Sequence, residues 1–331
     1  MTRGKAAADK FHLDVGENVL ASSGSRYENV QFLGSGGNAT TFLVLAASGP
    51  NEGNLFALKV FRLLSNAERR TKFLNEVSFL KENVHPSIMR VFDEGEFPAE
   101  GDTYPFVVAE YLPTTLAQVP KESLGLAEKL SYTMQLLSAL TFLQALNPPI
   151  VHRDIKPRNI FLKGRACVLG DFGLMKRLDG ADDVDREVFK ESTGPGMPYR
   201  YRTPDLVAYA LNKKDLTCKS DVFQLGLVLA EIFTDQMLCK ESRNALDPVK
   251  LEELPFIKGK LGGRIAFQIK RMLIEDPDER PVASDLLKLW RPYFMEAVNA
   301  AHTLDGEVFD PIVPFREKPY RGVSRGRRRF R

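Results

Sequence analysis

Four side chains between residues 154 and 171 have the types and spacing needed for phosphoryl transfer. Asp154 can accept a proton from a hydroxyl nucleophile, and Lys156, two residues later, can reach a phosphate while it is transferred. Asn159 and Asp171 offer the hard oxygen ligands that Mg²⁺ prefers. Phosphoryl transfer requires a proton acceptor, cations near the phosphate and a metal ion that neutralises its charge. These four residues therefore predict a catalytic loop with a magnesium site.

A further candidate is Lys59, which lies inside the apolar run 55–61. A lysine in a buried strand is unfavourable unless it is paired, so the run predicts an acidic partner; the alternative is an edge strand with the lysine in solvent. We expect the partner on the next helix, where apolar residues recur at helical spacing. Glu76 lies beside that apolar face, whereas the alternatives Glu68 and Glu82 fit a solvated face better.

The segment 33–42 contains three glycines between two strand-like runs. Glycines such as Gly34 and Gly36 let backbone N–H groups close over a phosphate without obstruction by side chains. A plain hairpin turn is the alternative reading of such a segment. The position of the segment just before Lys59 favours the phosphate-binding interpretation.

These motifs together resemble those of Ser/Thr protein kinases. Residues 151–159 read Val-His-Arg-Asp-Ile-Lys-Pro-Arg-Asn and residues 171–173 read Asp-Phe-Gly, which match the catalytic loop and the metal-binding triplet of that family. The glycine segment is similar to the family's glycine-rich loop, with Ala39 where a third glycine is usual and Thr41 where valine is usual. The resemblance covers residues 27 to about 295 in the family's order.

The resemblance implies an α+β fold with two lobes. A protein kinase domain is expected over about residues 27–300, with a small β-rich lobe at about 27–110 and a mainly helical lobe at about 113–300. Residues 1–26 would be an N-terminal extension, with a short strand near residues 11–15, and residues 301–331 a C-terminal tail. The implied reaction transfers the γ-phosphoryl group of ATP to Ser or Thr hydroxyls of protein substrates, the chain itself included. Lys156 is typical of Ser/Thr kinases.

The resemblance also assigns an ATP site. Lys59, fixed by Glu76, would grip the α- and β-phosphates, and Asn159 and Asp171 would hold Mg²⁺. Backbone groups near Glu110 and Leu112 would bind adenine in the hinge between the lobes, behind which Ala109 is the gatekeeper. The full set of implied ATP-binding residues is Leu33, Gly34, Gly36, Thr41, Ala57, Lys59, Glu76, Glu110, Leu112 and Phe161.

The segment between Asp171 and Asp205 resembles an activation segment and is rich in acids and loop formers. Arg153 is the residue that in the family can bind an activating phosphate. Ser192 and Thr193 are candidate phosphorylation sites, with simple turn residues as the alternative. In the segment, Pro198 stands where the family usually has a threonine that contacts the catalytic residues.

Two further matches imply structural roles. Asp221, in an apolar helix, is expected to anchor the catalytic-loop backbone by hydrogen bonds. Arg280 is expected to form an ion pair with Asp205, which stands where the family has glutamate, so the shorter side chain is expected to reach it less well. Helical periodicity predicts core helices over 123–146 and 282–301, and residues 160–169 are expected to form a hairpin that delivers Asp171.

Composition is that of an ordinary globular protein. The chain has 331 residues, of which 44% are apolar and 27% charged. No run of residues is long and apolar enough for a membrane span, and the N-terminus lacks the apolar core of a signal peptide. The three cysteines are odd in number and fit no metal spacing, which favours a reducing, cytoplasmic compartment.

Charge is concentrated at the C-terminus. Residues 316–331 carry eight Lys or Arg and one Glu, a net +7, so residues 1–315 carry −4 of the total of +3. A segment of such composition is expected to be disordered and to bind an anionic partner: nucleic acid, an acidic protein or lipid. Ser324, among these arginines, is a candidate autophosphorylation site. A solubilising tail without a specific partner is the alternative.

Two other classes of function share part of this pattern. A small-molecule phosphotransferase has the same Asp, Asn and metal-binding Asp, but normally lacks the long activation segment and the distant arginine. A pseudokinase that acts as a nucleotide-binding scaffold would usually have lost Lys59, Asp154 or Asp171, and all three are present. The sequence therefore favours an active protein kinase.

Overall fold

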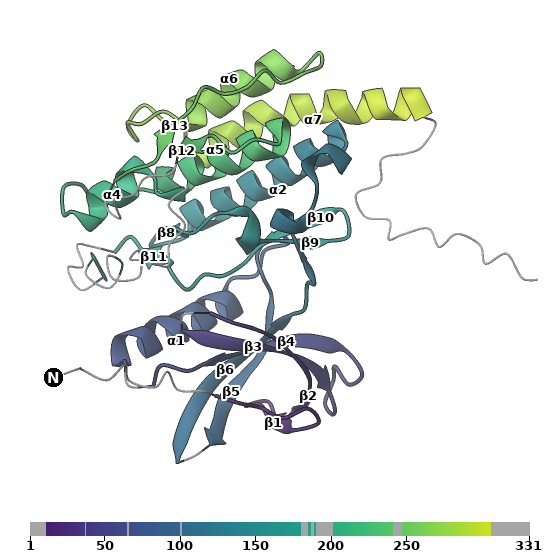
Figure 1. The fold of residues 1–331 in the computed structure, drawn as a ribbon, viewed down its shortest axis with the longest axis vertical. Helices are drawn as coiled ribbons and strands as arrows, with labels where there is room; N and C mark the ends of the chain where they lie inside the picture. The colour runs from purple at the N-terminus through teal and green to yellow at the C-terminus, as the bar shows by residue number, and fades with distance from the viewer. Residues whose placement is uncertain are drawn as a thin grey trace, which may run out of the picture.

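An antiparallel sheet of six strands forms one end of the molecule, in the order β1-β2-β3-β4-β6-β5 (Figure 1). The computed structural model describes residues 11–36, 38–64, 66–99, 101–179, 185–186, 189, 201–240 and 247–305. The strands of the sheet are β1 (Asn18–Leu20), β2 (Arg26–Ser35), β3 (Ala39–Ala46), β4 (Leu55–Phe61), β5 (Val91–Ala99) and β6 (Asp102–Glu110).

The two faces of this sheet have different roles, as strand β4 shows. Phe56, Leu58 and Val60 are buried in the core of the sheet, whereas the alternate residues Ala57 and Lys59 are partly exposed on the other face. Since side chains alternate along a strand, the sequence of β4 places one apolar set in the core and leaves Lys59 on the face toward the second lobe.

Residues 11–26, the described part of the predicted N-terminal extension, pack on this lobe. The side chains of Phe11, Leu13 and Val19 are buried in the same core as strand β4. The short strand lies at β1, which pairs with β2, and not at residues 11–15. Phe11 packs against Tyr104 and Phe42 from distant parts of the chain, a contact that no local pattern reveals.

Helix α1 (Ala67–Glu82) packs against the sheet and is the element nearest the second lobe (Figure 1). The side chain of Asn66 caps its N-terminus by accepting a hydrogen bond from the backbone N–H of Arg69 at 2.9 Å. Phe73 and Val77 bury one face of the helix against Phe61 and its neighbours. This packing fixes the direction in which Glu76 points.

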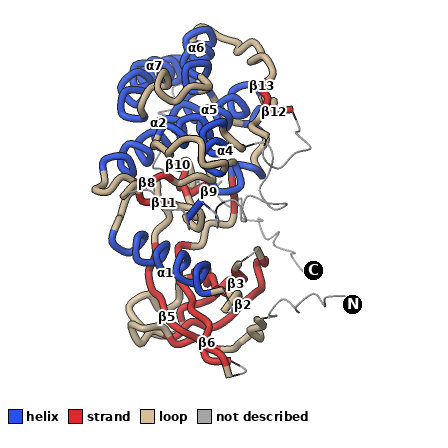
Figure 2. Tube along the Cα trace, turned by 90° about the vertical axis from the view of Figure 1, so that its left-hand side faces the viewer, coloured by secondary structure: helices blue, strands red, loops and turns tan. Residues whose placement is uncertain are grey.

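The second lobe is mainly helical, and Figure 2 shows its helices gathered at the end opposite the sheet. Its helices are α2 (Leu126–Ala145), α4 (Pro204–Ala210), α5 (Lys219–Thr234), α6 (Gly262–Met272) and α7 (Ala283–Asp305). Its short strands are β7 (Thr114–Thr115), β8 (Ile150–Val151), β9 (Ile160–Lys163), β10 (Ala166–Leu169), β11 (Lys176–Arg177), β12 (Cys239–Lys240) and β13 (Lys250–Leu251).

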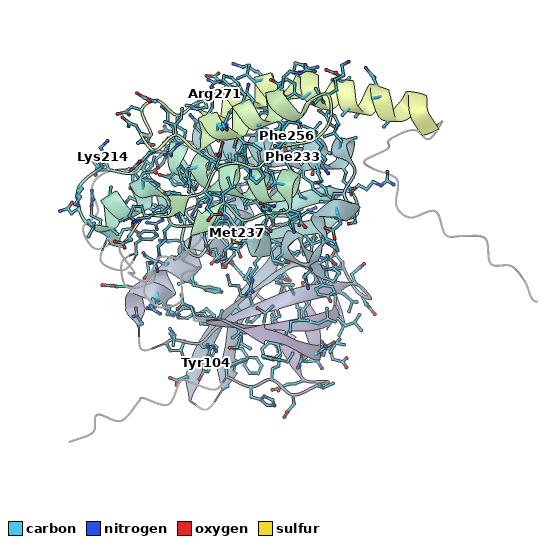
Figure 3. All side chains as sticks on the ribbon, turned by 45° about the horizontal axis from the view of Figure 1, so that its top comes forward. Tyr104, Lys214, Phe233, Met237, Phe256 and Arg271 are labelled. Carbon is cyan, nitrogen blue, oxygen red and sulfur yellow. The ribbon has the colours of Figure 1, made fainter. Side chains whose placement is uncertain are left out.

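Helix α5 runs through the centre of this lobe and is buried along most of its length. It shares one core with α2 and α7, in which Trp290 is fully enclosed, and Phe233 and Met237 pack against that core from its edge (Figure 3). Within the described residues, no helix combines the length and apolar content needed to cross a bilayer. The buried helix α5 can therefore hold the loops that pack against it in a fixed position.

Candidate active site

Helix α5 holds the loop that contains Asp154. The Asp221 carboxylate accepts hydrogen bonds from the backbone N–H groups of His152 and Arg153 at 2.7 and 2.9 Å, which confirms the predicted anchor. Gln224 adds two bonds: its side-chain oxygen accepts from Ile155 N–H at 2.9 Å, and its amide donates to the Arg153 carbonyl at 2.9 Å. These bonds hold Arg153 at φ 69°, a conformation that non-glycine residues seldom adopt.

The resulting turn brings Asp154, Lys156 and Asn159 together. Lys156 Nζ lies 2.9 and 2.8 Å from the two carboxylate oxygens of Asp154. Asn159 Nδ2 donates to Asp154 Oδ2 at 2.8 Å and to its carbonyl at 2.9 Å. Burial raises the pKa of Asp154 to about 6, although Lys156 opposes the shift. Asp154 is therefore a carboxylate oriented by two neighbours and able to take up a proton near neutral pH.

The predicted hairpin of β9 and β10 is present and leads directly to Asp171. Its end is fastened to the catalytic loop, because Gly170 N–H donates to the Asn159 carbonyl at 2.9 Å and His152 Nε2 bonds the Gly170 carbonyl at 3.1 Å. Burial lowers the pKa of His152 to about 4, so its imidazole is neutral at pH 7. Phe172 is buried beside His152, with ring centres 4.5 Å apart.

Lys59 connects the two lobes. Its Nζ lies 3.0 Å from Glu76 Oε1 on α1 and 3.3 Å from Asp171 Oδ1, so the predicted ion pair with Glu76 forms. Burial would lower the pKa of Lys59, but the charges of Glu76 and Asp171 outweigh burial and raise it, which keeps the ammonium charged. The alternatives Glu68 and Glu82 are exposed on the helix surface.

Asn159 and Asp171 have donor groups that suit Mg²⁺. Both hydrogen bonds of the Asn159 amide nitrogen go to Asp154, and within the described residues its oxygen accepts none. A Cβ added to Gly173 would lie 3.5 Å from Asp171 Oδ1, so glycine leaves space beside that carboxylate. The described residues contain no group of three or more His, Cys, Asp or Glu side chains that could hold a metal ion by themselves. A few hard oxygens beside a phosphate site are what Mg²⁺ usually uses.

The register of the sheet aligns the glycine segment with Lys59. Gly34 lies opposite Thr41, and Thr41 lies opposite Lys59 on the next strand. Gly36 N–H closes the hairpin by donating to the Ala39 carbonyl at 2.8 Å. A Cβ at Gly34 would meet no atom of the described residues within 4 Å, so packing among those residues does not demand glycine there. Leu33, which precedes Gly34 on β2, is exposed.

The gatekeeper assignment agrees with the register of β4 and β6. Ala109 lies opposite Ala57, and Val107 lies opposite Lys59. Because cross-strand partners point to the same face, Ala109 and Ala57 share the face that carries Lys59. Glu110, which ends β6, forms an ion pair with Lys163 on β9.

Two more predicted residues complete this part of the site. Leu112 is partly buried in the connection after β6. Phe161 packs over Gly170, where an added Cβ would lie 2.9 Å from its ring, so glycine is required for this contact.

The predicted pair of Asp205 and Arg280 forms deep in the helical lobe. Arg280 Nη1 and Nη2 lie 3.0 and 3.3 Å from the two oxygens of Asp205, so the shorter acid reaches its partner after all. The expectation that aspartate would reach less well is therefore wrong. Packing of the loop before α7 carries the guanidinium to the carboxylate.

Two residues that the sequence did not single out lie at the site. Gln224 was visible only as a polar interruption of an apolar helix, which in retrospect is the signal of a buried hydrogen-bonding role. Asp185 was one of several acids in the activation segment, yet it forms a two-point ion pair with Arg153, at 2.7 and 3.1 Å. Ser192, Thr193, Pro198 and the tail with Ser324 lie outside the described residues.

Comparison with known proteins supports the family resemblance. A model of the protein kinase domain matches residues 27–294. The dual specificity mitogen-activated protein kinase kinase 7 of Rattus norvegicus is 30% identical over 286 residues, which are 81% of this chain and 65% of that protein. The probable serine/threonine-protein kinase nek3 of Dictyostelium discoideum is 31% identical over 282 residues, 80% of this chain and 23% of that protein.

A more distant relative is the Wee1-like protein kinase of Arabidopsis thaliana, 28% identical over 266 residues, which are 79% of this chain and 48% of that protein. The chain thus spans less than two thirds of the length of each of these relatives. The matched residues 27–294 include most of both lobes and every active-site residue described above. The chain therefore belongs to the protein kinase family.

Proposed function

We propose that the chain transfers the γ-phosphoryl group of ATP to Ser and Thr hydroxyls of proteins, including its own. One observation carries the proposal: Asp154, oriented by Lys156 and Asn159, lies in the same site as a Lys59 that contacts both Glu76 and Asp171. Active protein kinases need the pair between lysine and the helix glutamate, and the metal-binding aspartate, in place at the same time.

In the proposed reaction, each residue has one task. Asp154 accepts a hydrogen bond from the substrate hydroxyl and takes its proton as the oxygen attacks the γ-phosphorus. The bond between the γ-phosphorus and the oxygen that bridges to the β-phosphate breaks, and ADP leaves. Lys156, which already touches Asp154, stabilises the charge on the transferred phosphoryl group. Lys59 holds the α- and β-phosphates, and Glu76 keeps its ammonium in place. The reaction is thus mainly one of positioning and charge stabilisation.

The register of the sheet strands supports the proposed nucleotide site. Gly34, Thr41 and Lys59 lie in one cross-strand row, so a phosphate held by Lys59 would lie under the glycine hairpin. Asn159 and Asp171 would hold Mg²⁺ through their oxygens. When bound, Mg²⁺ supplies positive charge that neutralises the phosphates.

The choice of hydroxyl rests on Lys156 and on the relatives. Lys156 follows the sequence pattern typical of Ser/Thr kinases and contacts the proton acceptor directly. Nek3 is named as a serine/threonine kinase and mitogen-activated protein kinase kinase 7 as dual specificity. Phosphoamino-acid analysis of the product decides the point; phosphotyrosine as the main product would contradict the proposal.

The test is a transfer assay with radiolabelled ATP, Mg²⁺ and a generic protein substrate. Asp154→Asn and Lys59→Met should each abolish transfer while the protein stays folded, because one removes the proton acceptor and the other the phosphate clamp. The matched control is Lys81→Met, which removes a surface lysine that pairs with Glu94 on the same lobe. Substantial activity in either active-site variant would overturn the assigned roles.

The same assay separates the two other classes of function. A scaffold would bind ATP and transfer nothing to any acceptor. A small-molecule phosphotransferase would label a small hydroxyl compound and leave protein unlabelled. Either result would replace the proposal.

A further inference from the structure

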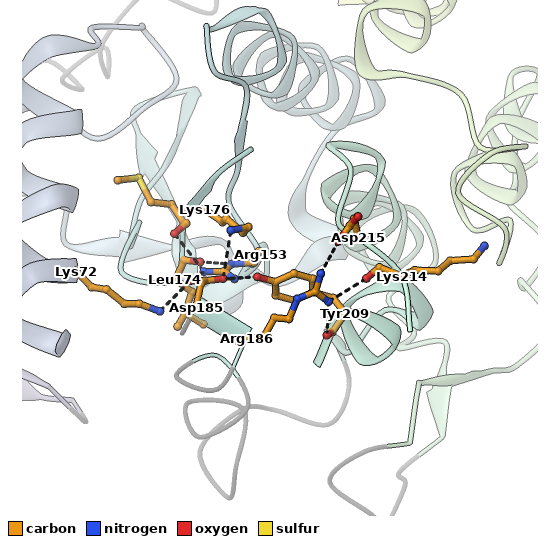
Figure 4. A network of polar contacts seen from close by, with 10 residues as sticks. Lys72, Arg153, Leu174, Lys176, Asp185, Arg186, Tyr209, Lys214 and Asp215 are labelled. Atoms are coloured by element: carbon orange, nitrogen blue, oxygen red, sulfur yellow. Dashed lines mark hydrogen bonds and ion pairs between the residues drawn. The ribbon is translucent and has the colours of Figure 1, made fainter. Parts of the chain in front are cut away.

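Asp185 lies at the centre of a polar network that joins both lobes (Figure 4). Its carboxylate accepts two hydrogen bonds from Arg153 of the catalytic loop, at 2.7 and 3.1 Å. Lys72 of helix α1 donates to it at 3.0 Å, and the Tyr209 hydroxyl of α4 donates at 2.7 Å. Lys176 Nζ of β11 lies 3.9 Å away. One carboxylate therefore contacts four elements that are distant in sequence.

The contact with Lys72 matters because of its place on α1. Lys72 is four residues before Glu76, so the two side chains lie one turn apart on the same face of the helix. Glu76 is held by Lys59 and Lys72 by Asp185. Helix α1 is thus attached at two neighbouring points: Glu76 contacts Lys59 of the sheet, and Lys72 contacts Asp185, which in turn binds Arg153 of the catalytic loop.

Arg153 explains why a negative charge is needed here. Its side chain is 0% exposed, and a guanidinium removed from water is unfavourable without a counter-ion. Its other N–H groups donate to the carbonyls of Leu174 and Met175, which tie it to the segment that follows Asp171. Asp185 supplies the carboxylate on the remaining side.

The carboxylate is ionised in this setting. Burial would raise the pKa of Asp185, but hydrogen bonds from Arg153 and the charges of Arg153 and Lys72 outweigh it and hold that pKa well below its ordinary value. Burial and the nearby Asp185 raise the pKa of Tyr209, so the phenol keeps its proton and acts as a donor. Asp185 is therefore a charged acceptor in the network, and Tyr209 is a neutral donor to it.

We propose that Asp185 is a positioning residue whose carboxylate supplies the negative charge that links Arg153 to helix α1. Phosphoryl transfer by this chain therefore needs no phosphorylated residue in the segment between Asp171 and Asp205. A phosphate in that segment could bind Arg153 only by displacing Asp185, whose two oxygens already accept hydrogen bonds from Lys72, Tyr209 and both Nη atoms of Arg153. The inference rests on the proposed kinase function.

The first experiment measures progress curves of protein that has been treated with phosphatase and freed of it. Intact mass confirms that the starting protein carries no phosphate. We expect transfer to an added protein substrate to begin at its full rate, without a lag and at every enzyme concentration. A lag that shortens with enzyme concentration or with preincubation in ATP would show that phosphorylation is required and would overturn the proposal.

The second experiment changes the carboxylate itself. Asp185→Asn keeps the shape and removes the charge, and should lower kcat/KM roughly 100-fold, as misplacement of catalytic groups does. Asp185→Glu should restore a large part of the rate. The matched control is Asp215→Asn. Asp215 is 81% exposed and forms an ion pair with Arg186, the residue that follows Asp185 in the sequence. Equal rates for wild type and Asp185→Asn would contradict the proposal.

Two further variants guard against a loss that merely reflects poor folding. Lys72→Met leaves the ion pair between Arg153 and Asp185 intact. It should lower kcat/KM roughly tenfold through a higher KM for ATP, because helix α1 keeps only its attachment through Glu76. Asp185→Ala leaves space for a small carboxylate, so formate should restore activity while chloride at equal ionic strength should not. Failure of both effects would sink the inference even if Asp185→Asn were inactive.

A readout without catalysis separates this inference from the proposed function. Hydrogen exchange of the amides in α1 should become faster in Asp185→Asn and in Lys72→Met than in wild type, while exchange in α2 should not change. If the wild-type protein transfers no phosphate but amide exchange in α1 is faster in both variants, the proposed kinase function is wrong and the structural role of the network is supported. Unchanged exchange in an active protein would refute the network alone.

Discussion

The buried pair of Arg280 and Asp205 offers a measurable test of how the helical lobe is held together. Arg280 is 0% exposed and Asp205 3% exposed in their side chains. Besides its two bonds to Asp205, the guanidinium donates to the carbonyls of Lys219, Ile274 and Glu275 at 2.6, 3.0 and 3.1 Å. Arg280→Met would leave the Asp205 carboxylate buried, with the Ser220 hydroxyl as the side-chain donor that still contacts it among the described residues.

Removal of one partner from a buried ion pair destabilises a protein by about 3–5 kcal/mol, since the other charge stays in a low-dielectric site. We expect Arg280→Met to lower the free energy of unfolding by that amount. Asp205→Asn in the same background should recover roughly 1–3 kcal/mol, because it removes the uncompensated charge. The coupling between the two sites is therefore expected to be large and favourable.

The assay is urea unfolding followed by tryptophan fluorescence. Trp290 is the single tryptophan of the chain and is fully buried in the lobe that contains the pair, so its emission reports on that lobe. The matched control is Arg264→Met, which removes a partly exposed pair with Glu296 and should change stability by less than about 1 kcal/mol. Additive effects of the two changes, or a loss from Arg280→Met as small as that of the control, would refute the reasoning.

Three further predictions concern the active site. Asp154 must be deprotonated to accept a proton, and burial raises its pKa to about 6. We therefore expect kcat/KM to fall about tenfold per pH unit below that pKa and to level off above it. A pH profile that is flat between about pH 5 and about pH 8 would exclude this role. Glu76→Gln should raise the KM for ATP roughly tenfold, because Lys59 loses a charged partner; an unchanged KM in steady-state kinetics would contradict this. Ala109→Met should block an ATP-competitive inhibitor with a bulky aromatic group while sparing ATP; equal inhibition curves at matched ATP saturation would show that Ala109 does not face the pocket.

Local pattern in the sequence was enough to predict much of the site. Asp154, Lys156 and Asn159 are close neighbours in sequence, so the sequence already assigned them to one loop, whose conformation Asp221 and Gln224 of helix α5 then fix. The choice of Glu76 over Glu68 and Glu82 followed from helical periodicity, which reports directly which residues lie next to the buried face. These features depend on distances of a few residues along the chain.

Other features depended on how the lobes fold. The packing of Phe11 against Tyr104 joins residues far apart in sequence, so residues 11–26 gave no local sign of belonging to the sheet. The reach of Asp205 to Arg280 was likewise decided by the backbone around them, and the length of the side chain alone predicted the wrong result.

Asp185 shows most clearly what local sequence pattern could not predict. Within its segment it differs in no visible way from Asp179, Asp182 or Asp183. Its role comes from Lys72, Arg153 and Tyr209, which lie on three separate elements and converge only when the two lobes are assembled. The sequence by itself determines which charges exist and the local element on which each lies, whereas tertiary packing decides which charges meet, because ion pairing depends on separation in space and on removal from water.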